Sequence, residues 1–473
     1  MGHRAKRWLY LTHRWLGIAT CLLMAMWFLS GMVMMYVPFP SLTAAERLEG
    51  LAPIDWQAVT SIPERSRSAR SLVLEQSLTR PVWRLDQADG SAKTISASTG
   101  RDLPGVDAEQ AVLIGEAFAR APSTSVEAID RDQWTVAGGY DRYRPLWKIG
   151  LLGPRSRVLY VASTDGRVVL DTSRRERFWN WIGSVPHWLY PTVLRQDQPL
   201  WRQVVLWTSG LCIVGAVAGM WIGILRVRLR RRYKGGRTTP YRGWQFWHHM
   251  LGLIGGTVLS TWIVSGWLSV DPGRLFDSPG LSDESIGAYE RAGSLPAINW
   301  SRIVALPEAQ NARRVRAIWV DRQPRLVFER TGVAPAVLDL PSLVPTRIDN
   351  RRLVAAARRL LPHVTIIGAG LLTHSDAYWY EAKGQVELPI LRVKFGDPAR
   401  TWIHISPRTG EIVGSSDSRR RLYRWLYAGL HRWDFDFLRQ LGPIWDLWMW
   451  AWLIPGLALA VSGVVIGFKR LAR

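Results

Sequence analysis

Four histidines stand in two pairs at equivalent positions of an internal repeat. An offset of 244 residues carries His187 to His431, and an offset of 235 residues carries His13 to His248. A neutral imidazole is the commonest metal ligand in proteins, so these pairs are the strongest candidates for chemistry. The larger offset also relates many tryptophans and glycines, as expected of a tandem duplication. It carries Trp56 to Trp300, Gly166 to Gly410, Trp181 to Trp425, Trp201 to Trp445, Gly219 to Gly463 and Gly223 to Gly467.

Four long apolar stretches predict helices that cross a membrane. Each is long enough to span a bilayer core of about 30 Å, which takes roughly 20 helical residues. A signal peptide is the alternative for the first stretch, but its apolar run is too long and its repeat equivalent is internal, so we expect an uncleaved anchor. The stretches run from Trp15 to Val37, Trp201 to Leu225, Trp247 to Val270 and Trp445 to Phe468.

Positive charge predicts how these helices are oriented. The formal net charge is +23, and basic residues crowd both ends of the chain and the segment between the second and third helices. Lysine and arginine mark cytoplasmic segments, so we expect both termini and this loop in the cytoplasm. Topology and anionic lipid explain the basic excess, and we expect no nucleic acid partner. The residues are Arg4, Lys6, Arg7, Arg226, Arg228, Arg230, Arg231, Arg232, Lys234, Arg237, Lys469, Arg470 and Arg473.

The predicted fold class is an integral membrane bundle of four helices with two extracytoplasmic α+β domains. In each outer domain a helical run behind an Asp or Asn N-cap precedes alternating strands joined by a glycine turn. The helical runs are Asp107 to Arg120 and Asn350 to Leu361, and the strands fall within Leu146 to Leu151, Val158 to Leu170, Pro389 to Phe395 and Trp402 to Val413. The predicted parts are residues 1–39 (N-terminus and helix 1), 40–195 (outer domain 1), 196–226 (helix 2), 227–243 (basic loop), 244–271 (helix 3), 272–440 (outer domain 2) and 441–473 (helix 4 and C-terminus).

This topology sorts the four histidines into two layers. His13 and His248 lie near the cytoplasmic starts of their helices, whereas His187 and His431 precede helices that begin on the outer side. Within a layer one histidine comes from each half, so a twofold repeat axis along the membrane normal would bring the pair face to face. Facing imidazoles are the expected axial ligands of a b-type haem. We therefore predict two b-type haems, one in each leaflet.

For any one of these histidines taken alone an interfacial polar role is the better explanation, and only their duplication in two layers favours haem ligation. A flat macrocycle also needs small residues against it. Glycines available at these depths are Gly17, Gly31, Gly210, Gly219, Gly252, Gly266 and Gly463.

Three further residues are candidates for contact with the cofactor. His249 lies about 100° around the helix from His248, so it is either the true ligand or a partner for a haem propionate. Arg14 and Arg432 directly follow ligand candidates, and a guanidinium suits a propionate through paired hydrogen bonds. Snorkelling to lipid phosphate explains the two arginines equally well.

Other cofactors and reactions lack a motif. Cys21 and Cys212 are the only cysteines and lie inside predicted membrane helices, so they provide neither a disulfide framework nor a C-x-x-C-H attachment for covalent haem. The chain has no glycine-rich dinucleotide or phosphate loop. It also has no G-x-S-x-G or H-E-x-x-H signature of a hydrolase.

The chain resembles the PepSY-associated transmembrane family, often called iron-regulated membrane proteins. The hairpins ending in Ser-Thr-Asp-Gly-Arg-Val-Val and Ser-Pro-Arg-Thr-Gly-Glu-Ile-Val are similar to PepSY domains, and His-Arg-Trp-Leu-Gly, His-His-Met-Leu-Gly and Leu-His-Arg-Trp are similar to the family's membrane elements. The resemblance covers nearly the whole chain. It implies PepSY-like outer domains and a multi-pass protein of the bacterial inner membrane.

The characterised relatives in this family are reductases that release iron from siderophores with two haems in a four-helix bundle. The resemblance therefore implies an oxidoreductase that passes electrons from a quinol or a cytoplasmic reductase to a periplasmic acceptor. A ferric siderophore is the expected acceptor, with free ferric ion, copper or another periplasmic partner as alternatives. The alternative from another class is a non-redox, membrane-anchored PepSY protein that binds peptide or regulates a protease or sensor.

Overall fold

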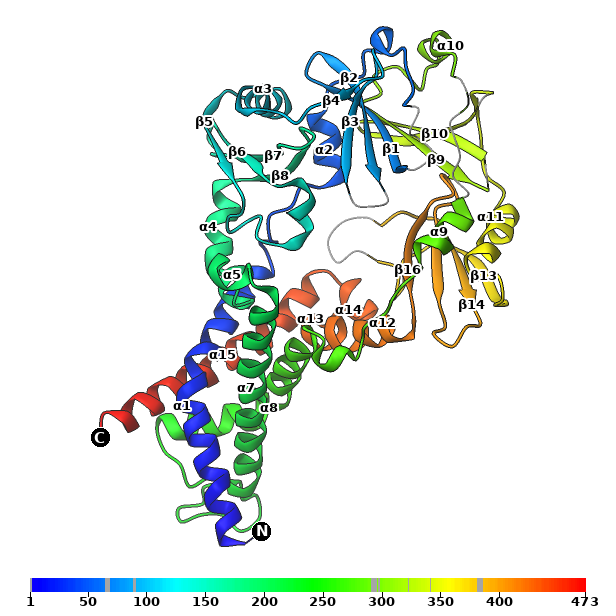
Figure 1. Ribbon diagram of the computed structural model, residues 1–473. Helices are drawn as coiled ribbons and strands as arrows, with labels where there is room; N and C mark the ends of the chain where they lie inside the picture. Colours follow the sequence, from blue (N-terminus) through cyan, green and yellow to red (C-terminus); the bar gives the residue numbers. More distant parts are fainter. Residues whose placement is uncertain are drawn as a thin grey trace.

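The computed structural model describes residues 2–473 except 64–68, 88–90, 291–295, 297, 322, 341 and 381–385. It consists of a bundle of four long helices and an outer region that contains three β-sheets (Figure 1). Both chain ends lie on the bundle, away from the sheets (Figure 1).

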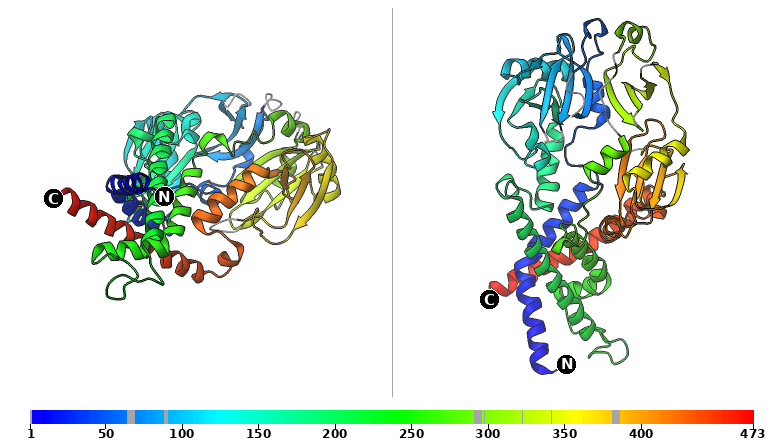
Figure 2. Two further views of the ribbon diagram at one scale, coloured as in Figure 1. Left: turned by 90° about the horizontal axis from the view of Figure 1, so that it is seen from below. Right: turned by 45° about the vertical axis from the view of Figure 1, so that its right-hand side comes forward.

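The four helices of the bundle are each long and apolar enough to cross a membrane. They are α1 (His3–Met34), α7 (Gln198–Arg226), α8 (Trp244–Leu268) and α15 (Pro443–Leu471). Helix α1 packs beside α7 and α15, and α8 packs beside the same two helices, while α15 crosses α1 obliquely (Figure 2). Helices α1 and α8 therefore face each other diagonally across the bundle. The four predicted long apolar helices are confirmed, although α1 begins at His3 rather than near Trp15.

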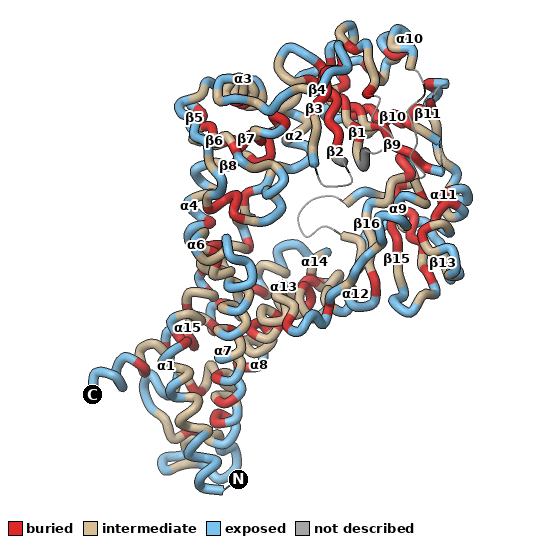
Figure 3. The backbone as a smooth tube through the Cα atoms, in the orientation of Figure 1, coloured by how far each residue is buried: buried red, intermediate tan, exposed pale blue. Residues whose placement is uncertain are grey.

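Large apolar side chains cover the outer surface of this bundle. Much of the helical backbone is intermediate or exposed, whereas the sheets carry many buried residues (Figure 3). A continuous apolar surface of this kind is compatible with lipid around it rather than water. The exposed side chains include Trp15, Leu22, Leu29, Trp207, Val214, Val217, Trp221, Ile254, Leu447 and Ile454.

Each half of the chain contributes one four-stranded antiparallel sheet packed against one helix. The first sheet consists of β5 (Ser123–Ile129), β6 (Leu146–Leu151), β7 (Val158–Ala162) and β8 (Val168–Thr172), with α3 (Ala108–Ala119). The second consists of β13 (Ile366–Leu372), β14 (Ile390–Phe395), β15 (Trp402–Ile405) and β16 (Ile412–Ser416), with α11 (Asn350–Ala357). The α+β composition predicted for the outer segments is confirmed.

Local sequence signals explain where these elements begin and turn. The Asp107 side chain accepts a hydrogen bond from the backbone N–H of Gln110 and caps α3, as an N-cap aspartate does. In the second half Asp349, and not Asn350, caps α11. Gly166 and Gly410 adopt φ values of +73° and +78°, which favour glycine, so both hairpin turns occur where they are predicted.

The third sheet has eight strands and is shared by the two halves, in the order β12-β11-β10-β9-β1-β2-β3-β4. Its central strands β1 and β9 are antiparallel, and Leu72 pairs with Ala317 while Val73 pairs with Arg316. The 244-residue offset carries Leu72 to Arg316 and Val73 to Ala317, so each pair is the repeat equivalent of the other. The repeat axis therefore passes between the two pairs. The strands are β1 (Ala69–Ser77), β2 (Arg80–Gln87), β3 (Ala92–Ser96), β4 (Asp102–Leu103), β9 (Arg314–Val320), β10 (Gln323–Arg330), β11 (Val333–Asp339) and β12 (Val344–Pro345).

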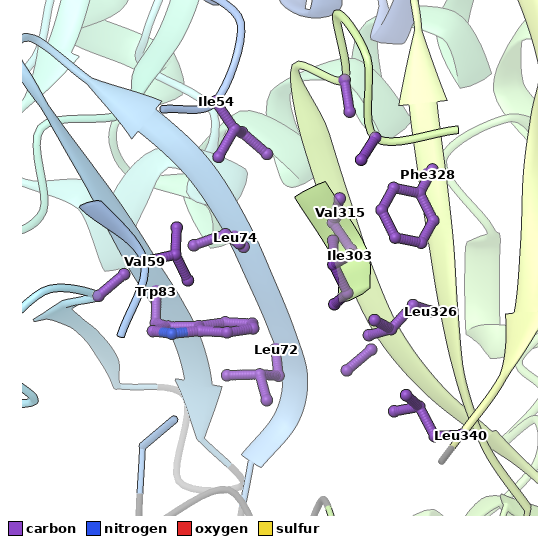
Figure 4. Packing of buried hydrophobic residues seen from close by; sticks show 14 of the residues in the cluster. Ile54, Val59, Leu72, Leu74, Trp83, Ile303, Val315, Leu326, Phe328 and Leu340 are labelled. Carbon is purple, nitrogen blue, oxygen red and sulfur yellow. The ribbon is translucent and has the colours of Figure 1, made fainter. Parts of the chain in front are cut away.

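One hydrophobic core lies across this junction. Leu74 and Trp83 from the first half pack in the same cluster as Val315 and Phe328 from the second (Figure 4). Trp56 stacks on its repeat equivalent Trp300, with ring centres 6.5 Å apart. Burial of aromatic and branched side chains is the main stabilising term. The outer segments 40–195 and 272–440, predicted as two domains, are thus joined by a common sheet and core.

Short helices connect the sheets to the bundle. They are α4 (Arg174–Ile182), α5 (Ser184–His187) and α6 (Thr192–Arg195) in the first half, and α12 (Ser418–Tyr423), the π-helix η6 (Arg424–Gly429), α13 (Leu430–Arg432) and α14 (Asp436–Arg439) in the second. A capping box between Ser173 and Glu176 starts α4. The remaining short helices are α2 (Ala44–Gly50), η1 (Trp56–Ala58), η3 (Gly138–Tyr143), η4 (Pro272–Arg274), α9 (Asp283–Glu290), α10 (Trp300–Val304) and η5 (Arg358–Leu360).

Candidate functional site

The structure brings His187 and His431 together at the outer end of the bundle. His187 ends α5, which packs against α1, and His431 lies in α13, which packs against α8. Their ring centres are 6.1 Å apart, and the ring planes are inclined by 75°. The two imidazoles of the outer layer therefore face each other, as the repeat predicts.

Each outer histidine is held by the bundle helix beside it, through its Nδ1 atom. His187 Nδ1 lies 3.0 Å from Ser30 Oγ and 3.2 Å from the carbonyl oxygen of Trp27. His431 Nδ1 lies 3.0 Å from Ser265 Oγ and 3.1 Å from the carbonyl oxygen of Trp262. The offset of 235 residues carries the first set of partners onto the second, so the two halves position their histidines in the same way.

His13 and His248 form the inner pair and face each other from the diagonal helices α1 and α8. Their ring centres are also 6.1 Å apart, with the planes inclined by 41°. His13 Nδ1 lies 3.0 Å from the carbonyl oxygen of Gly215. His248 Nδ1 lies 3.0 Å from Ser462 Oγ and 3.3 Å from the carbonyl oxygen of Leu459. Again the partner helix, α7 or α15, fixes the ring.

These contacts fix the tautomer of the rings. Backbone carbonyls only accept hydrogen bonds, so an Nδ1 atom beside one must carry the proton. The serine contacts lead to the same tautomer. Ser30, Ser265 and Ser462 donate their own hydroxyl protons to backbone carbonyls of their helices, so each serine oxygen can only accept a hydrogen bond from the histidine. All four Nδ1 atoms therefore donate. The Nε2 atoms keep their lone pairs, which are the electrons a metal ion needs.

Four of the predicted glycines lie against the histidine rings. A Cβ atom on Gly31 would lie 3.5 Å from Cε1 of His187, and one on Gly266 would lie 3.4 Å from Cε1 of His431. In the inner layer Gly219 is packed against His13 and Gly463 against His248. The other three, Gly17, Gly210 and Gly252, do not contact these histidines.

A cavity of about 880 Å³ opens beside the outer pair and is lined by both His187 and His431. Its walls are mostly apolar and come from all four helices of the bundle, with Arg432, Asp434 and Tyr427 among the polar residues that line it. Ligand and cofactor sites in proteins commonly have volumes of about 300–1,000 Å³ and such mixed walls. The outer pair therefore has room beside it for a cofactor-sized molecule.

The second half places an aromatic stack on His431, next to this cavity. The Tyr427 ring stacks on His431 with ring centres 5.3 Å apart, and Tyr423 stacks on Tyr427 at 5.4 Å. Tyr427 belongs to the π-helix η6, an irregularity that is frequent at functional sites. Its repeat equivalent is Gly183, so the two halves differ at this point.

The remaining candidates occupy different surroundings. Arg432 lines the outer cavity and forms an ion pair with Asp434 at 2.9 Å. Arg14 is exposed. His249 is buried and turned toward α7, where its Nε2 atom lies 3.0 Å from the carbonyl oxygen of Gly223. Of the two adjacent histidines, His248 is the one that faces His13.

The other histidines lie outside the two pairs. His404 is buried in β15, accepts a hydrogen bond from Arg392 at 2.8 Å and stacks on Trp379. Burial, and then the positive charge of Arg392, lower the pKa of His404 to about 4. His363 and His374 are exposed. Within the described part of the chain, no group of three or more His, Cys, Asp or Glu side chains could hold a metal ion.

Three serines that position the histidines were not predicted from the sequence. Ser30, Ser265 and Ser462 are almost fully buried within the long apolar helices, where a polar side chain is expected to have a partner. The offset of 235 carries Ser30 to Ser265, so the repeat contains the signal. No protein-family model matches this chain, and no curated protein matches its sequence significantly.

Proposed function

We propose that this protein is a b-type haem oxidoreductase that carries electrons through the inner membrane to a periplasmic acceptor, with a ferric siderophore as the acceptor. The observation that supports this most strongly is the pair of facing imidazoles in each of two layers, at the same ring separation of 6.1 Å. The resemblance to the PepSY-associated transmembrane family supplies the choice of acceptor.

The ring separation fits one iron between each pair. A metal–imidazole bond is about 2 Å long, and the centre of the ring lies about 1 Å behind the bonding nitrogen. Two ligands on opposite sides of one metal ion therefore place their ring centres about 6 Å apart, close to the value in both layers. Each pair has only two protein ligands, which suits a cofactor that brings its equatorial ligands with it.

Different residues would contact different parts of this cofactor. His13 with His248, and His187 with His431, would hold the haem iron through their Nε2 atoms, while the Nδ1 contacts hold the rings in place. Haem supplies a one-electron couple whose potential depends on its ligands and surroundings. Arg432, which lines the outer cavity, would meet a propionate there, and the glycines leave space for the macrocycle.

The two layers lie near opposite faces of the bilayer. His13 and Ser30, the residue that holds His187, are 17 positions apart on α1, which corresponds to about 25 Å of helix. His248 and Ser265 have the same separation on α8. This rise covers most of a hydrocarbon core of about 30 Å, so the two pairs together bridge the membrane.

The proposed reaction at the outer face is the transfer of one electron to chelated ferric iron. The ferric ion becomes ferrous, which oxygen-rich chelators bind far more weakly, and the iron is released. The donor at the inner face is a quinol or a cytoplasmic reductase. Oxidation of one quinol to a quinone releases two protons and two electrons, and the two electrons reduce two ferric ions one after the other. Acceptors other than a siderophore are the alternatives within the same chemistry.

The test of this function follows the electron from protein to acceptor. Purified protein is reduced with dithionite, separated from excess reductant and mixed with a ferric trihydroxamate complex. Haem oxidation is recorded by stopped-flow absorbance, and a ferrous-specific chelator traps the product. We expect one ferrous ion for each haem oxidised, and loss of rapid oxidation in His187→Ala. The control variant His363→Ala changes an exposed histidine and should behave as wild type. Haem that remains reduced in the presence of the complex would contradict the siderophore assignment.

A further inference from the structure

In three of the four candidate histidine ligands, the Nδ1–H group donates to a serine oxygen as well as to a backbone carbonyl. In the fourth, His13, it donates to a carbonyl alone. Ser30, Ser265 and Ser462 lie 3.0 Å from the Nδ1 atoms of His187, His431 and His248. The 244-residue offset places Ala218 where the second half has Ser462, so His13 has only the carbonyl of Gly215. The outer pair thus has two serine acceptors, and the inner pair has one.

We propose that these serines set the reduction potentials of the two haem sites and make the outer site the stronger reductant. This inference rests on the proposed haem function. It assigns Ser30, Ser265 and Ser462 as positioning and tuning residues that act through the histidines, and it treats Ala218 as the position that leaves the inner site with weaker electron donation.

The physical reason is the effect of an acceptor on the far side of an imidazole. When Nδ1–H donates to an oxygen, the ring gains electron density and Nε2 becomes a more basic ligand. A more basic ligand stabilises the ferric state, which carries the higher positive charge, so the potential falls. A backbone carbonyl accepts from each of the four rings. The serines are therefore the difference in the Nδ1 hydrogen bonds of the four rings.

The surroundings strengthen these contacts. The three serines are at most 1 % exposed, so water does not compete for the histidine proton, and a hydrogen bond in a low-dielectric interior is electrostatically stronger. Each hydroxyl proton is already donated to a backbone carbonyl. The serine oxygens are thus held as acceptors, whichever oxidation state the site adopts.

The asymmetry suits the acceptor at the outer face, and it makes the step from the inner to the outer site uphill by about 28 mV for one serine, which a membrane potential that is negative on the cytoplasmic side offsets. Ferric iron in a tight oxygen-rich chelate is a poor oxidant, because the chelator stabilises the ferric state. A low potential at the outer pair gives the electron the driving force that this acceptor demands. The inner pair, with one serine, accepts electrons more readily from its donor.

The experiment is an optical redox titration of the full-length protein in detergent. Ser30→Ala and Ser265→Ala are titrated in a His13→Ala background, which leaves the outer haem alone. Ser462→Ala and Ala218→Ser are titrated in a His187→Ala background, which leaves the inner haem. Ser260→Ala is the control, because Ser260 lies in the same helix as His248 and its hydroxyl contacts Met220 of α7 rather than a histidine.

We expect each serine-to-alanine change to raise the midpoint and Ala218→Ser to lower it. The expected size is about a threefold change in the oxidised-to-reduced ratio at fixed potential, or about 28 mV at 59 mV per tenfold for one electron. If an alanine variant loses its haem, Ala218→Ser still tests the effect of a serine on the midpoint, because this substitution adds a hydroxyl and removes no side chain. Unchanged midpoints in haem-loaded variants would overturn this inference alone. A wild-type protein without haem would overturn the proposed function itself.

Discussion

Gly219 and Gly463 are repeat equivalents, yet we expect opposite outcomes when each is replaced by alanine. A Cβ atom on Gly219 would lie 2.4 Å from Cε1 and 2.8 Å from Nδ1 of His13. A Cβ atom on Gly463 would lie 3.4 Å from Cε1 of His248. Carbon atoms in contact are normally about 3.5–4.0 Å apart. Gly219→Ala must therefore move the His13 ring by about 1 Å, whereas Gly463→Ala requires a shift of a few tenths of an ångström.

A movement of about 1 Å is large for a metal ligand, whose bond lengths hold within about 0.2 Å. It also stretches the 3.0 Å contact between His13 Nδ1 and the Gly215 carbonyl beyond the range of a hydrogen bond. We expect Gly219→Ala to lose the inner haem and keep the outer one, so that haem per chain falls from two to one. Gly463→Ala should retain both.

The assay is haem per chain by pyridine haemochrome, on protein that elutes as a single species in gel filtration. The outer haem is the internal control for folding, because His187 and His431 do not contact Gly219. Two haems with unchanged spectra in Gly219→Ala would refute the reasoning. Equal loss in both glycine variants would also refute it, because only one of them forces the clash.

Three further predictions concern the adjacent histidines of α8, the shared core and the buried His404. His248→Ala should lose the inner haem while His249→Ala retains two, as measured by haem per chain; the reverse result would identify His249 as the ligand. Leu74→Ala should lower the unfolding free energy by about 2–5 kcal/mol, because Leu74 is fully buried in the core shared by the two halves; chemical unfolding in detergent measures this, and an unchanged midpoint would contradict a stabilising role for this core. Burial and Arg392 lower the pKa of His404 from 6.5 to about 4, so His404 binds a proton more readily in the unfolded chain than in the folded one. The stability that His404 contributes is therefore complete above pH 6.5 and is lost as the pH falls through about 4. Thermal unfolding of His404→Gln should therefore depend less on pH across this window than that of the wild type, and parallel pH profiles would contradict the assignment.

The internal repeat made much of this architecture predictable. Each membrane helix is a continuous apolar run, and the elements of the four-stranded sheets follow from Asp107, Gly166 and Gly410, whose roles are local. The pairing of His13 with His248 needed only the topology and the duplication. Local signals and symmetry together therefore identify both histidine pairs before any contact is known.

The features that escaped prediction depend on contacts between distant residues. The pairing of β1 with β9 joins residues more than 200 positions apart, and strand periodicity contains no information on which edges meet. The choice between His248 and His249 depends on how α8 is rotated, which neighbouring helices decide. The roles of Ser30 and Ser265 were also hidden, because a serine in an apolar helix commonly bonds only to its own backbone.

The central claim is that each chain holds two haems between its paired histidines. The most direct measurement is the visible spectrum of detergent-purified protein from haem-replete cells, oxidised and dithionite-reduced, with haem counted per chain. We predict two b-type haems in the wild type, one in His13→Ala and one in His187→Ala. A colourless protein would contradict the account and favour a non-redox PepSY protein that binds peptide or regulates a protease or sensor.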